Sequence, residues 1–207
     1  MRSKCKLIEL EWNCIQDVGK EANQHVESLR LSTKFRLGGV LLLENTSDEA
    51  ADMLFKLLVG IQIPHNDTGS IYMPPYLNYV YCPDIPVLFE GSILKNLLLG
   101  ARHALHGTLP TDAEAWELAK MCGLDAEFIG APETFNVGKA GRNLPLAARQ
   151  SISLARSLIS DPCVLLLHKP VSLLQPKQAA QVILALNDFV EFGGLWGMLS
   201  RNKRPHG

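Results

Sequence analysis

Apolar and polar positions along the chain predict strands and helices in alternation. The predicted strands are short apolar runs at residues 7–12, 39–44, 70–72, 77–81, 163–167 and 195–199. The predicted helices are longer stretches with apolar residues three and four apart, over residues 47–59, 92–99, 112–122, 146–160 and 176–192. Such alternation is typical of an α/β domain with a largely parallel sheet.

Two features refine this organisation. The runs 40–43 and 164–167 are apolar at every position, which predicts central strands covered by helices on both faces. Between residues 92 and 160 three predicted helices follow one another without a strand, as in a helical lobe inserted into the domain. We therefore expect residues 1–91 and 161–207 to form the two parts of one core and residues 92–160 to form a helical subdomain.

Composition excludes several functional classes. The chain has 207 residues, 47% hydrophobic and 20% charged, with a formal net charge of −1. This balance indicates a globular domain and offers no electrostatic reason to expect nucleic acid or an acidic membrane surface as a partner. Its apolar runs are far shorter than a membrane-spanning helix. We expect a cytoplasmic domain without direct membrane insertion, linked to a membrane only through a larger protein or a partner.

The cysteines and histidines do not suggest a metal site. Five cysteines without a C-x-x-C pair are typical of free thiols in a reducing compartment, and Cys163 is expected in a buried strand. His103 and His106 form a close pair of histidines, but no cysteine or carboxylate stands at ligand spacing beside them. We expect no metal site.

Three segments carry a resemblance to a known family. Residues 79–100, YVYCPDIPVLFEGSILKNLLLG, are similar to the Q-loop region of ABC exporter ATPases. Residues 137–162, VGKAGRNLPLAARQSISLARSLISDP, resemble the signature helix of that family, and residues 164–175, VLLLHKPVSLLQ, resemble its Walker B strand and D-loop. Order and spacing agree over about residues 6–201. The resemblance implies a P-loop NTPase-like ABC ATPase fold, in which helices flank a mostly parallel central sheet and an α-helical lobe is inserted.

The phosphate-binding loop of the family is degenerate in this chain. In the family, a glycine-rich loop surrounds the phosphates with backbone N–H groups, a lysine contacts them, and a serine or threonine binds Mg²⁺. The same frame falls on residues 45–53, NTSDEAADM. Asn45, Asp48 and Ala50 replace glycines, Ala51 replaces the lysine, and Asp52 replaces the Mg²⁺ ligand.

The charge of this loop also opposes a polyanion. Glu44, Asp48, Glu49 and Asp52 place four acids and no base within nine residues. One carboxylate about 6 Å from a phosphate charge costs about 0.7 kcal/mol in bulk water and about 3 kcal/mol at an effective dielectric of 20. A helix N-terminal dipole returns only about 0.3–1 kcal/mol. The acids also complement the dipole of the predicted helix, and both interpretations disfavour nucleotide.

The remaining chemical positions of the family have changed as well. His168 stands for the aspartate that orients Mg²⁺, and Lys169 stands for the glutamate that activates water; a lysine is a poor general base near neutral pH. Cys82 falls on the Q-loop glutamine, Gln175 on the D-loop aspartate, and Arg201 on the switch histidine.

The signature motif Ser-Gly-Gly-Gln is replaced by Pro145, Leu146, Ala147 and Ala148, which removes a hydroxyl and the close backbone approach. Residues that set turns and packing still fit the family. These are Val80, Pro83, Phe89, Gly91, Asn96, Gly138, Gly141, Leu144, Arg149, Gln150, Ala155, Arg156, Pro162 and Pro170. The loss is concentrated at the chemistry.

Two pairs of residues have alternative interpretations. His168 and Lys169 follow a predicted central strand, where open α/β sheets bind ligands, but we favour a solvated or paired strand end. Leu88 and Phe89 stand where family members contact the coupling helices of transmembrane partners, and core packing accounts for them just as well.

The sequence therefore predicts a non-catalytic ABC cassette-like domain that binds neither ATP nor Mg²⁺. The resemblance implies a regulatory or scaffolding module attached to an exporter-type membrane protein. Because the family domain usually continues beyond the last predicted strand, we expect the chain to be truncated. The expected partners are proteins: the transmembrane domains of an exporter, another ABC domain, or a second copy of the chain. The alternatives are an ATP-hydrolysing subunit with non-standard residues and a site for another small ligand.

Overall fold

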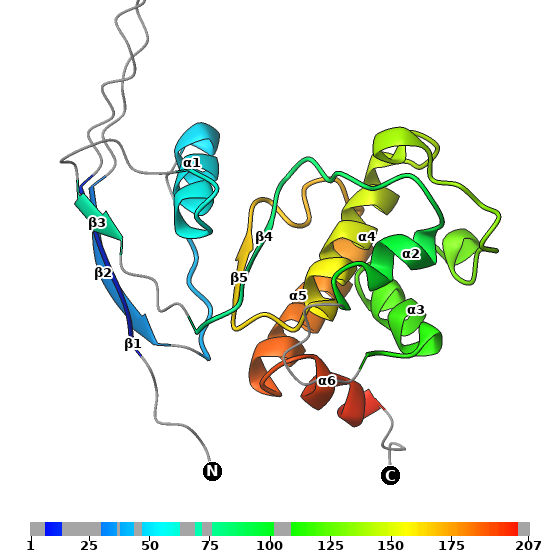
Figure 1. Ribbon diagram of the computed structural model, residues 1–207. Helices are drawn as coiled ribbons and strands as arrows, with labels where there is room; N and C mark the ends of the chain where they lie inside the picture. Colours follow the sequence, from blue (N-terminus) through cyan, green and yellow to red (C-terminus); the bar gives the residue numbers. More distant parts are fainter. Residues whose placement is uncertain are drawn as a thin grey trace, which may run out of the picture. The chain divides into compact units, whose positions relative to one another are not determined.

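The computed structural model describes residues 7–13, 30–36, 38–43, 47–62, 69–71, 76–101 and 109–202. These residues form two compact units that divide between Tyr79 and Val80 (Figure 1). The subdomain division predicted at residues 91 and 160, between core and helical subdomain, stays a prediction.

The first unit contains a three-stranded antiparallel sheet. β1 (Leu7–Asn13) lies between β2 (Arg30–Arg36) and β3 (Gly69–Ile71), in the order β2-β1-β3. β1 alternates apolar residues with two glutamates, the period expected for a strand with one buried face. The register sets apolar position Ile8 opposite Phe35.

A single helix, α1 (Asp48–Leu58), completes the described part of the first unit. Ser47 caps its N-terminus, and its first turn is acidic, which suits the positive end of the helix dipole. Its buried residues recur at intervals of three and four: Ala50, Leu54, Phe55, Leu57 and Leu58.

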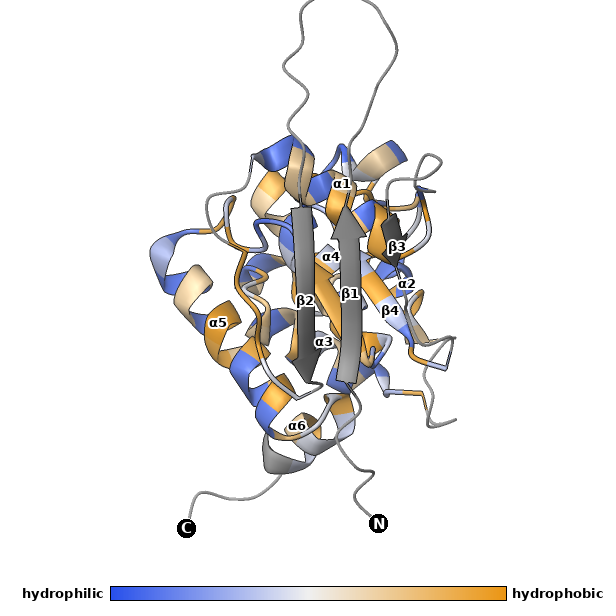
Figure 2. Cartoon of the chain, turned by 90° about the vertical axis from the view of Figure 1, so that its left-hand side faces the viewer, coloured by the Kyte–Doolittle hydropathy of each residue, from blue (hydrophilic) through white to orange (hydrophobic). Residues whose placement is uncertain are grey.

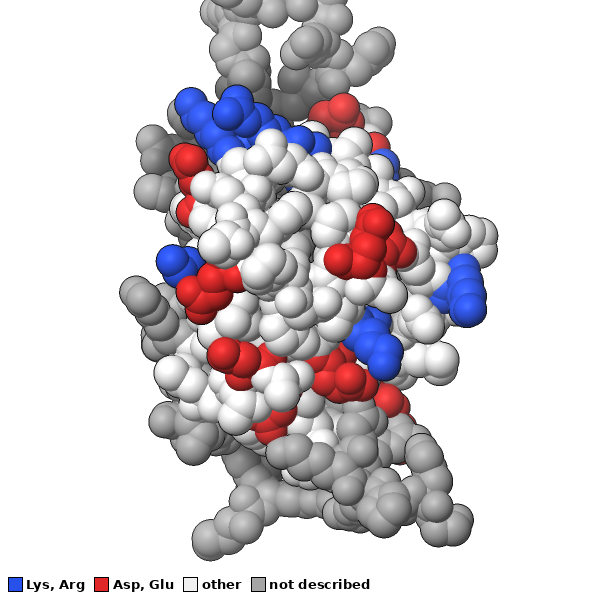
Figure 3. Space-filling model, turned by 90° about the vertical axis from the view of Figure 1, so that its right-hand side faces the viewer, with Lys and Arg blue, Asp and Glu red and all other residues white. Residues whose placement is uncertain are grey.

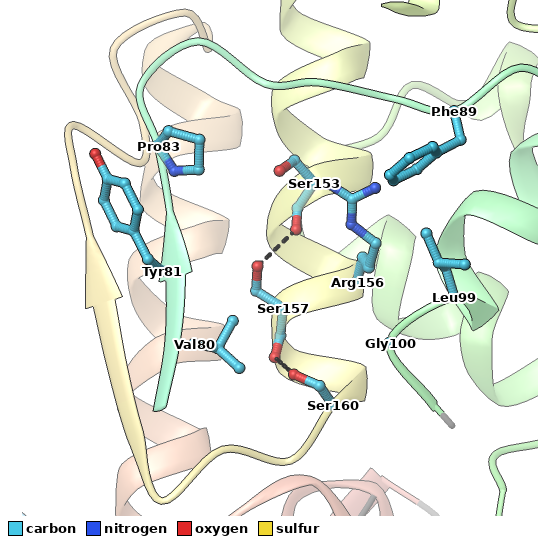
Figure 4. Close-up of a pocket in the computed structure, with 10 residues that line it drawn as sticks. All are labelled: Val80, Tyr81, Pro83, Phe89, Leu99, Gly100, Ser153, Arg156, Ser157 and Ser160. Atoms are coloured by element: carbon cyan, nitrogen blue, oxygen red, sulfur yellow. Dashed lines mark hydrogen bonds between the residues drawn. The ribbon is translucent and has the colours of Figure 1, made fainter. Parts of the chain in front are cut away.

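The second unit is built around a short strand pair. β4 (Tyr79–Cys82) and β5 (Val164–Leu167) are hydrogen-bonded neighbours and run in the same direction (Figure 4). Just beyond their ends, His168 N donates to Cys82 O at 3.0 Å. The pairing brings two segments 82 residues apart in sequence to one edge, because a parallel pair requires a long crossover connection.

The helices of this unit lie on one side of the pair, and α4 lies at their centre (Figure 1). The α-helices of the unit are α2 (Ile93–Leu98), α3 (Asp112–Met121), α4 (Leu146–Ile159), α5 (Pro176–Glu191) and α6 (Leu195–Asn202). Two short 3₁₀ helices, η2 (Ala126–Phe128) and η3 (Lys139–Gly141), connect α3 to α4. α4 packs on both α2 and α3. Among the described residues, no helix is both long and apolar enough to cross a membrane.

The outward face of α5 keeps apolar residues in contact with solvent. Ile183 and Leu184 are exposed, and Figure 2 shows α5 with apolar bands between hydrophilic ones. Val182, Ala185 and Phe189 form the buried face of the same helix.

The predicted strand over residues 39–44 is wrong for the part that the structure describes. Residues 39–43 form no strand, and Val40, Leu41 and Leu42 are 75%, 56% and 74% exposed. A continuous apolar run has no periodicity that would specify a strand, and no strand of the described chain pairs with this segment. The mostly parallel central sheet expected here is accordingly limited to the β4–β5 pair, whose strand β5 is only half-buried.

The predicted strand over residues 195–199 is also wrong, because this segment belongs to helix α6. Leu195, Met198 and Leu199 are buried and stand three and four residues apart, which is helical spacing. Asp161 Oδ1 accepts from Leu195 N at 2.8 Å, so a residue 34 positions earlier caps the helix.

Two further expectations changed. Strand β2 was missed, because its apolar residues are few and basic residues stand between them. Cys163 is exposed rather than buried, since β5 begins only at the next residue.

Candidate functional site

The first turn of α1 contains the positions that correspond to the phosphate loop. Ala50 N donates to Ser47 Oγ at 3.3 Å, and Ala51 N donates to Ser47 O at 3.0 Å. Asp48 and Glu49 are exposed. The first of these bonds is the N-cap, and the second is the first bond of the helix itself, so the capping hydroxyl takes up one N–H group of this helix start, with two carboxylates beside it. Asn45 and Glu44 lie outside the described residues.

One acid of this turn has a basic neighbour. Asp52 forms an ion pair with Lys56, one helical turn later. The sequence analysis counted no base within residues 44–52, and the structure thus reduces the local charge by pairing Asp52 with a residue beyond them. Both side chains are partly exposed, so this pair adds little to stability.

The end of β5 holds the two positions that correspond to the family's Mg²⁺-orienting aspartate and water-activating glutamate. His168 is buried, with Nδ1 3.9 Å from Asp84 Oδ1, so of the two expected alternatives, a solvated or a paired strand end, its side chain fits the paired one. Lys169 is exposed and has a positive φ of 49°, which is uncommon for a residue with a side chain. Neither residue carries an anionic oxygen, the ligand that Mg²⁺ prefers.

Cys82, at the Q-loop position, points into the protein. Its side chain is 2% exposed, and its Sγ lies 3.7 Å from Ser153 Oγ. Burial raises the pKa of the Cys82 thiol, against smaller opposing effects of hydrogen bonds to Ser153 and Ser157 and of the charge on Arg156. A buried neutral thiol is a weak nucleophile and a weak metal ligand.

The start of α4 corresponds to the signature motif. Pro145 is the N-cap and makes no side-chain hydrogen bond to the helix, and Leu146 is 49% exposed. Ala147 is half-buried and Ala148 is buried. A proline and a leucine thus occupy the helix start where the family has a serine and a glycine.

Basic residues surround this helix start. Residues 137–157 contain Lys139, Arg142, Arg149 and Arg156 and no acid. Figure 3 shows Lys and Arg side chains gathered at one end of this face, with acidic residues beside them and in small groups over the rest of it. This end of the second unit is therefore electropositive.

Gln150 ties α4 to the segment that follows β5. Its Nε2 donates to Lys169 O at 3.0 Å, and its Oε1 accepts from Leu173 N at 3.0 Å. Gln175, the D-loop position, is the exposed N-cap of α5, and its N donates to Gln178 Oε1. Residues that resemble the family framework thus still support the loops, although the chemical groups have changed.

Arg201 lies in α6, not after a strand. Only its backbone is described, so its side chain is outside the described residues, as are His103 and His106. Among the described residues, no group of three or more His, Cys, Asp or Glu side chains could hold a metal ion.

The sequence analysis missed a pocket in the second unit. The pocket has a volume of about 300 Å³ and lies between β4, α2 and α4 (Figure 4). Its polar lining includes Ser153, Arg156, Ser157 and Ser160. These residues stand three and four apart on one helix face, a pattern visible in the sequence, but their common surroundings depend on the packing of α2 and β4.

Leu88 and Phe89, beside this pocket, have different roles. Leu88 is 2% exposed and belongs to the core, whereas Phe89 is 60% exposed and lines the pocket. Asn96 holds the backbone of Phe89 from both sides, with Phe89 N donating to its Oδ1 and its Nδ2 donating to Phe89 O, both at 2.8 Å. Core packing therefore accounts for Leu88, and Phe89 is available for a partner.

The buried thiols predict a pH dependence of stability. Burial also raises the pKa of Cys122, which is fully buried. The native state keeps both thiols protonated, whereas the unfolded state ionises above a pH of about 8.5. The contribution of the two protonated thiols to stability is therefore present below that pH and is lost as the pH rises. The free energy of unfolding then falls by up to about 1.4 kcal/mol per thiol and per pH unit.

We expect the midpoint temperature of unfolding to decrease as the pH is raised from 8.5 to 10. Cys122→Ala should reduce the slope of this decrease with pH. Calorimetry over this range measures the effect. A Cys163→Ala variant, which removes an exposed thiol, is the control and should leave the slope unchanged; an equal effect of both variants would contradict the argument.

Comparisons with known proteins identify what the chain resembles. The sequence is 36% identical over 99 residues to ABC transporter 1 of Ajellomyces capsulatus, covering 47% of this chain and 7% of that protein. It is 36% identical over 92 residues to ABC transporter I family member 17 of Arabidopsis thaliana, covering 44% of this chain and 31% of that protein. The chain thus spans only a small part of the curated relatives it matches. No family model matches the sequence.

The fold has a clear structural neighbour. A bacterial Atm1-family ABC exporter solved with ATP bound superimposes with a TM-score of 0.68 at 18% identity, covering 91% of this chain and 33% of that chain. At this identity the likeness shows the fold. Sequence relatives that are ABC transporter proteins and a structural neighbour that is an ABC exporter together support an ABC domain in this chain.

Proposed function

We propose that this chain is an ABC cassette-like domain that neither binds nor hydrolyses ATP and that works as a regulatory or scaffolding module in a larger transport protein. The likeness to ABC transporters supports the transport context. The non-catalytic role rests on the described residues at the positions where the family binds nucleotide.

The observation that carries the proposal is the first turn of α1. Ser47 accepts hydrogen bonds from Ala50 N and Ala51 N, and Asp48 and Glu49 stand exposed beside them. A phosphate would have to replace the capping hydroxyl and approach two carboxylates, without the lysine that compensates its charge in the family. Capping is worth about 1 kcal/mol, and repulsion adds to that cost.

Exposed apolar residues support a protein as the partner of this module. Ile85, Val87 and Phe89 are exposed apolar residues on one segment, 70%, 55% and 60% exposed. Adjacent apolar residues on a surface favour a protein contact. The exporter-type membrane part of the same or a partner protein is the partner we propose.

A titration with Mg-ATP tests the absence of nucleotide binding. Saturation at 100 times the Kd would stabilise the native state by about 2.7 kcal/mol, or about 5–10 °C for a domain of this size. We expect no shift of the unfolding midpoint at 5 mM Mg-ATP, and no phosphate release above background.

A variant with the family residues restored is the positive control for this measurement. It combines Asp48→Gly, Ala50→Gly, Ala51→Lys and Asp52→Ser. This variant should show a positive shift with ATP if these residues are what prevents binding. A shift in the unmodified chain that EDTA abolishes would instead favour an ATP-binding subunit with non-standard residues.

A further inference from the structure

The outward side of α5 carries a second periodic pattern, opposite its buried face. Val182, Ala185 and Phe189 form the buried face. Five exposed residues form a row on the other side: Lys177, Ala180, Leu184, Asn187 and Glu191. They follow one another at alternate steps of three and four residues, which is the heptad spacing by which one helix packs along another. We call these five residues the outer row of α5.

The middle of the outer row is apolar. Leu184 is 65% exposed, and Ile183 beside it is 50% exposed; Figure 2 shows the apolar bands of this helix. Ala180, one turn earlier, is small and exposed, so a second helix could approach closely at this point. Contact with another helix would remove these side chains from water.

The charges at the two ends of the outer row oppose the dipole of their own helix. α5 has no acidic residue in its first turn and no basic residue in its last turn. Lys177 instead stands at the positive end and Glu191 at the negative end, although a helix is stabilised by the reverse arrangement. Neither side chain forms an ion pair within the described parts of the chain. Both charges become favourable beside a helix that runs in the opposite direction and carries complementary charges.

A second copy of α5 supplies such a helix. Leu184 lies seven residues from Lys177 and seven from Glu191, or about 10 Å along the axis in each direction. A two-fold axis at Leu184 therefore sets Lys177 of each copy against Glu191 of the other. It also sets Asn187 beside Ala180 of the second copy, and a polar residue in such a row fixes the register of a helix pair.

We propose that the chain forms a homodimer through the outer row of α5, with the two helices antiparallel and Leu184 at the two-fold axis. The same surface serves both copies, so the contact is closed. One helix pair buries less area than a permanent dimer interface, and the expected dimer is reversible, with a Kd on the order of 100 µM. This inference goes beyond the proposed function and does not depend on it, because the contact requires neither nucleotide nor a membrane partner.

Sedimentation equilibrium of the 207-residue chain without nucleotide tests the dimer, at about 10 to 500 µM to span the expected Kd. We expect the average mass to rise from that of one chain toward that of two. Leu184→Gln, which removes the apolar centre of the row, should weaken the dimer at least about tenfold. A monomer at every concentration, a dimer that requires Mg-ATP, or an unchanged Kd in Leu184→Gln overturns the proposal.

Charge reversal tests the antiparallel register. Lys177→Glu opposes two glutamates at both ends of the pair and should weaken the dimer about tenfold. The same change agrees better with the helix dipole, so the Tm of the monomer should not fall, which separates a lost contact from a lost fold. Adding Glu191→Lys exchanges the two charges, and this double variant should dimerise at least about fivefold more tightly than Lys177→Glu alone.

Lys139→Glu is the control for these variants, because it reverses an exposed charge outside α5. It should leave the Kd of the dimer unchanged. A double variant that dimerises as weakly as Lys177→Glu, or a control that weakens the dimer as much, overturns the proposal.

Discussion

Asn96→Ala is expected to lower the free energy of unfolding by about 2–4 kcal/mol, because three hydrogen bonds of a buried amide are lost. Asn96 is 2% exposed, exchanges two bonds with the backbone of Phe89, and donates a third to Ser92 O at 3.0 Å. Alanine would leave the partly buried N–H and C=O of Phe89 without these partners. Urea unfolding followed by circular dichroism measures the change.

An exposed asparagine is the control for Asn96. Asn143 also donates its Nδ2 to a backbone carbonyl, that of Asn136, at 2.9 Å, but it is solvent-exposed, so Asn143→Ala should cost less than about 1 kcal/mol. If Asn96→Ala costs no more than this control, water replaces the lost bonds and Asn96 does not hold the pocket rim.

Gly100→Ala is expected to cost about 2–3 kcal/mol, because the new methyl group has no space. A Cβ at Gly100 would lie 2.5 Å from Arg156 O and 3.3 Å from Ser160 Cβ. The nearest atom belongs to the backbone of α4 and cannot rotate away, so the C-terminal end of α2 and α4 would have to separate. Thermal and urea unfolding both measure this effect.

Gly130→Ala separates steric from conformational costs. Gly130 has φ +69° and no atom within 4 Å of a Cβ, so alanine there meets only the penalty of the left-handed conformation, about 1–2 kcal/mol. Gly100 does not have a positive φ, and its cost is steric alone. A Gly100→Ala variant as stable as the unmodified chain would show that α2 and α4 are not in close contact, and the pocket would then lack its closed end.

Sequence patterns predicted helices α2 to α5 of the second unit well, because each carries its own signals. Thr111 precedes α3 with Glu114 three residues on, and their side chains form a reciprocal capping box in the structure. α5 begins with Pro176 at its first position and ends before Gly193, as the sequence indicates. Such signals act within a few residues and do not depend on the rest of the fold.

Strands were predicted less well, because a strand depends on a partner that the sequence does not specify. Residues 39–43 and residues 164–167 are similar apolar runs, yet only the second is a strand in the described structure, where β4 pairs with it. The segment from Leu195 is a helix because its spacing is helical and because Asp161, distant in sequence, caps it. Apolarity alone does not distinguish these outcomes.

By itself the sequence determined which side chains stand at the positions that resemble the family's motifs, since side-chain identity at a motif position requires no coordinates. It also determined the acidic start of α1 and the basic start of α4. Only the tertiary structure decided that His168 is buried while Lys169 is exposed, that Leu88 packs inside while Phe89 faces solvent, and that Arg156 Nη1 is buried without a hydrogen-bond partner among the described residues. Burial and unsatisfied hydrogen bonds depend on which segments meet in space, and local patterns carry no information about that.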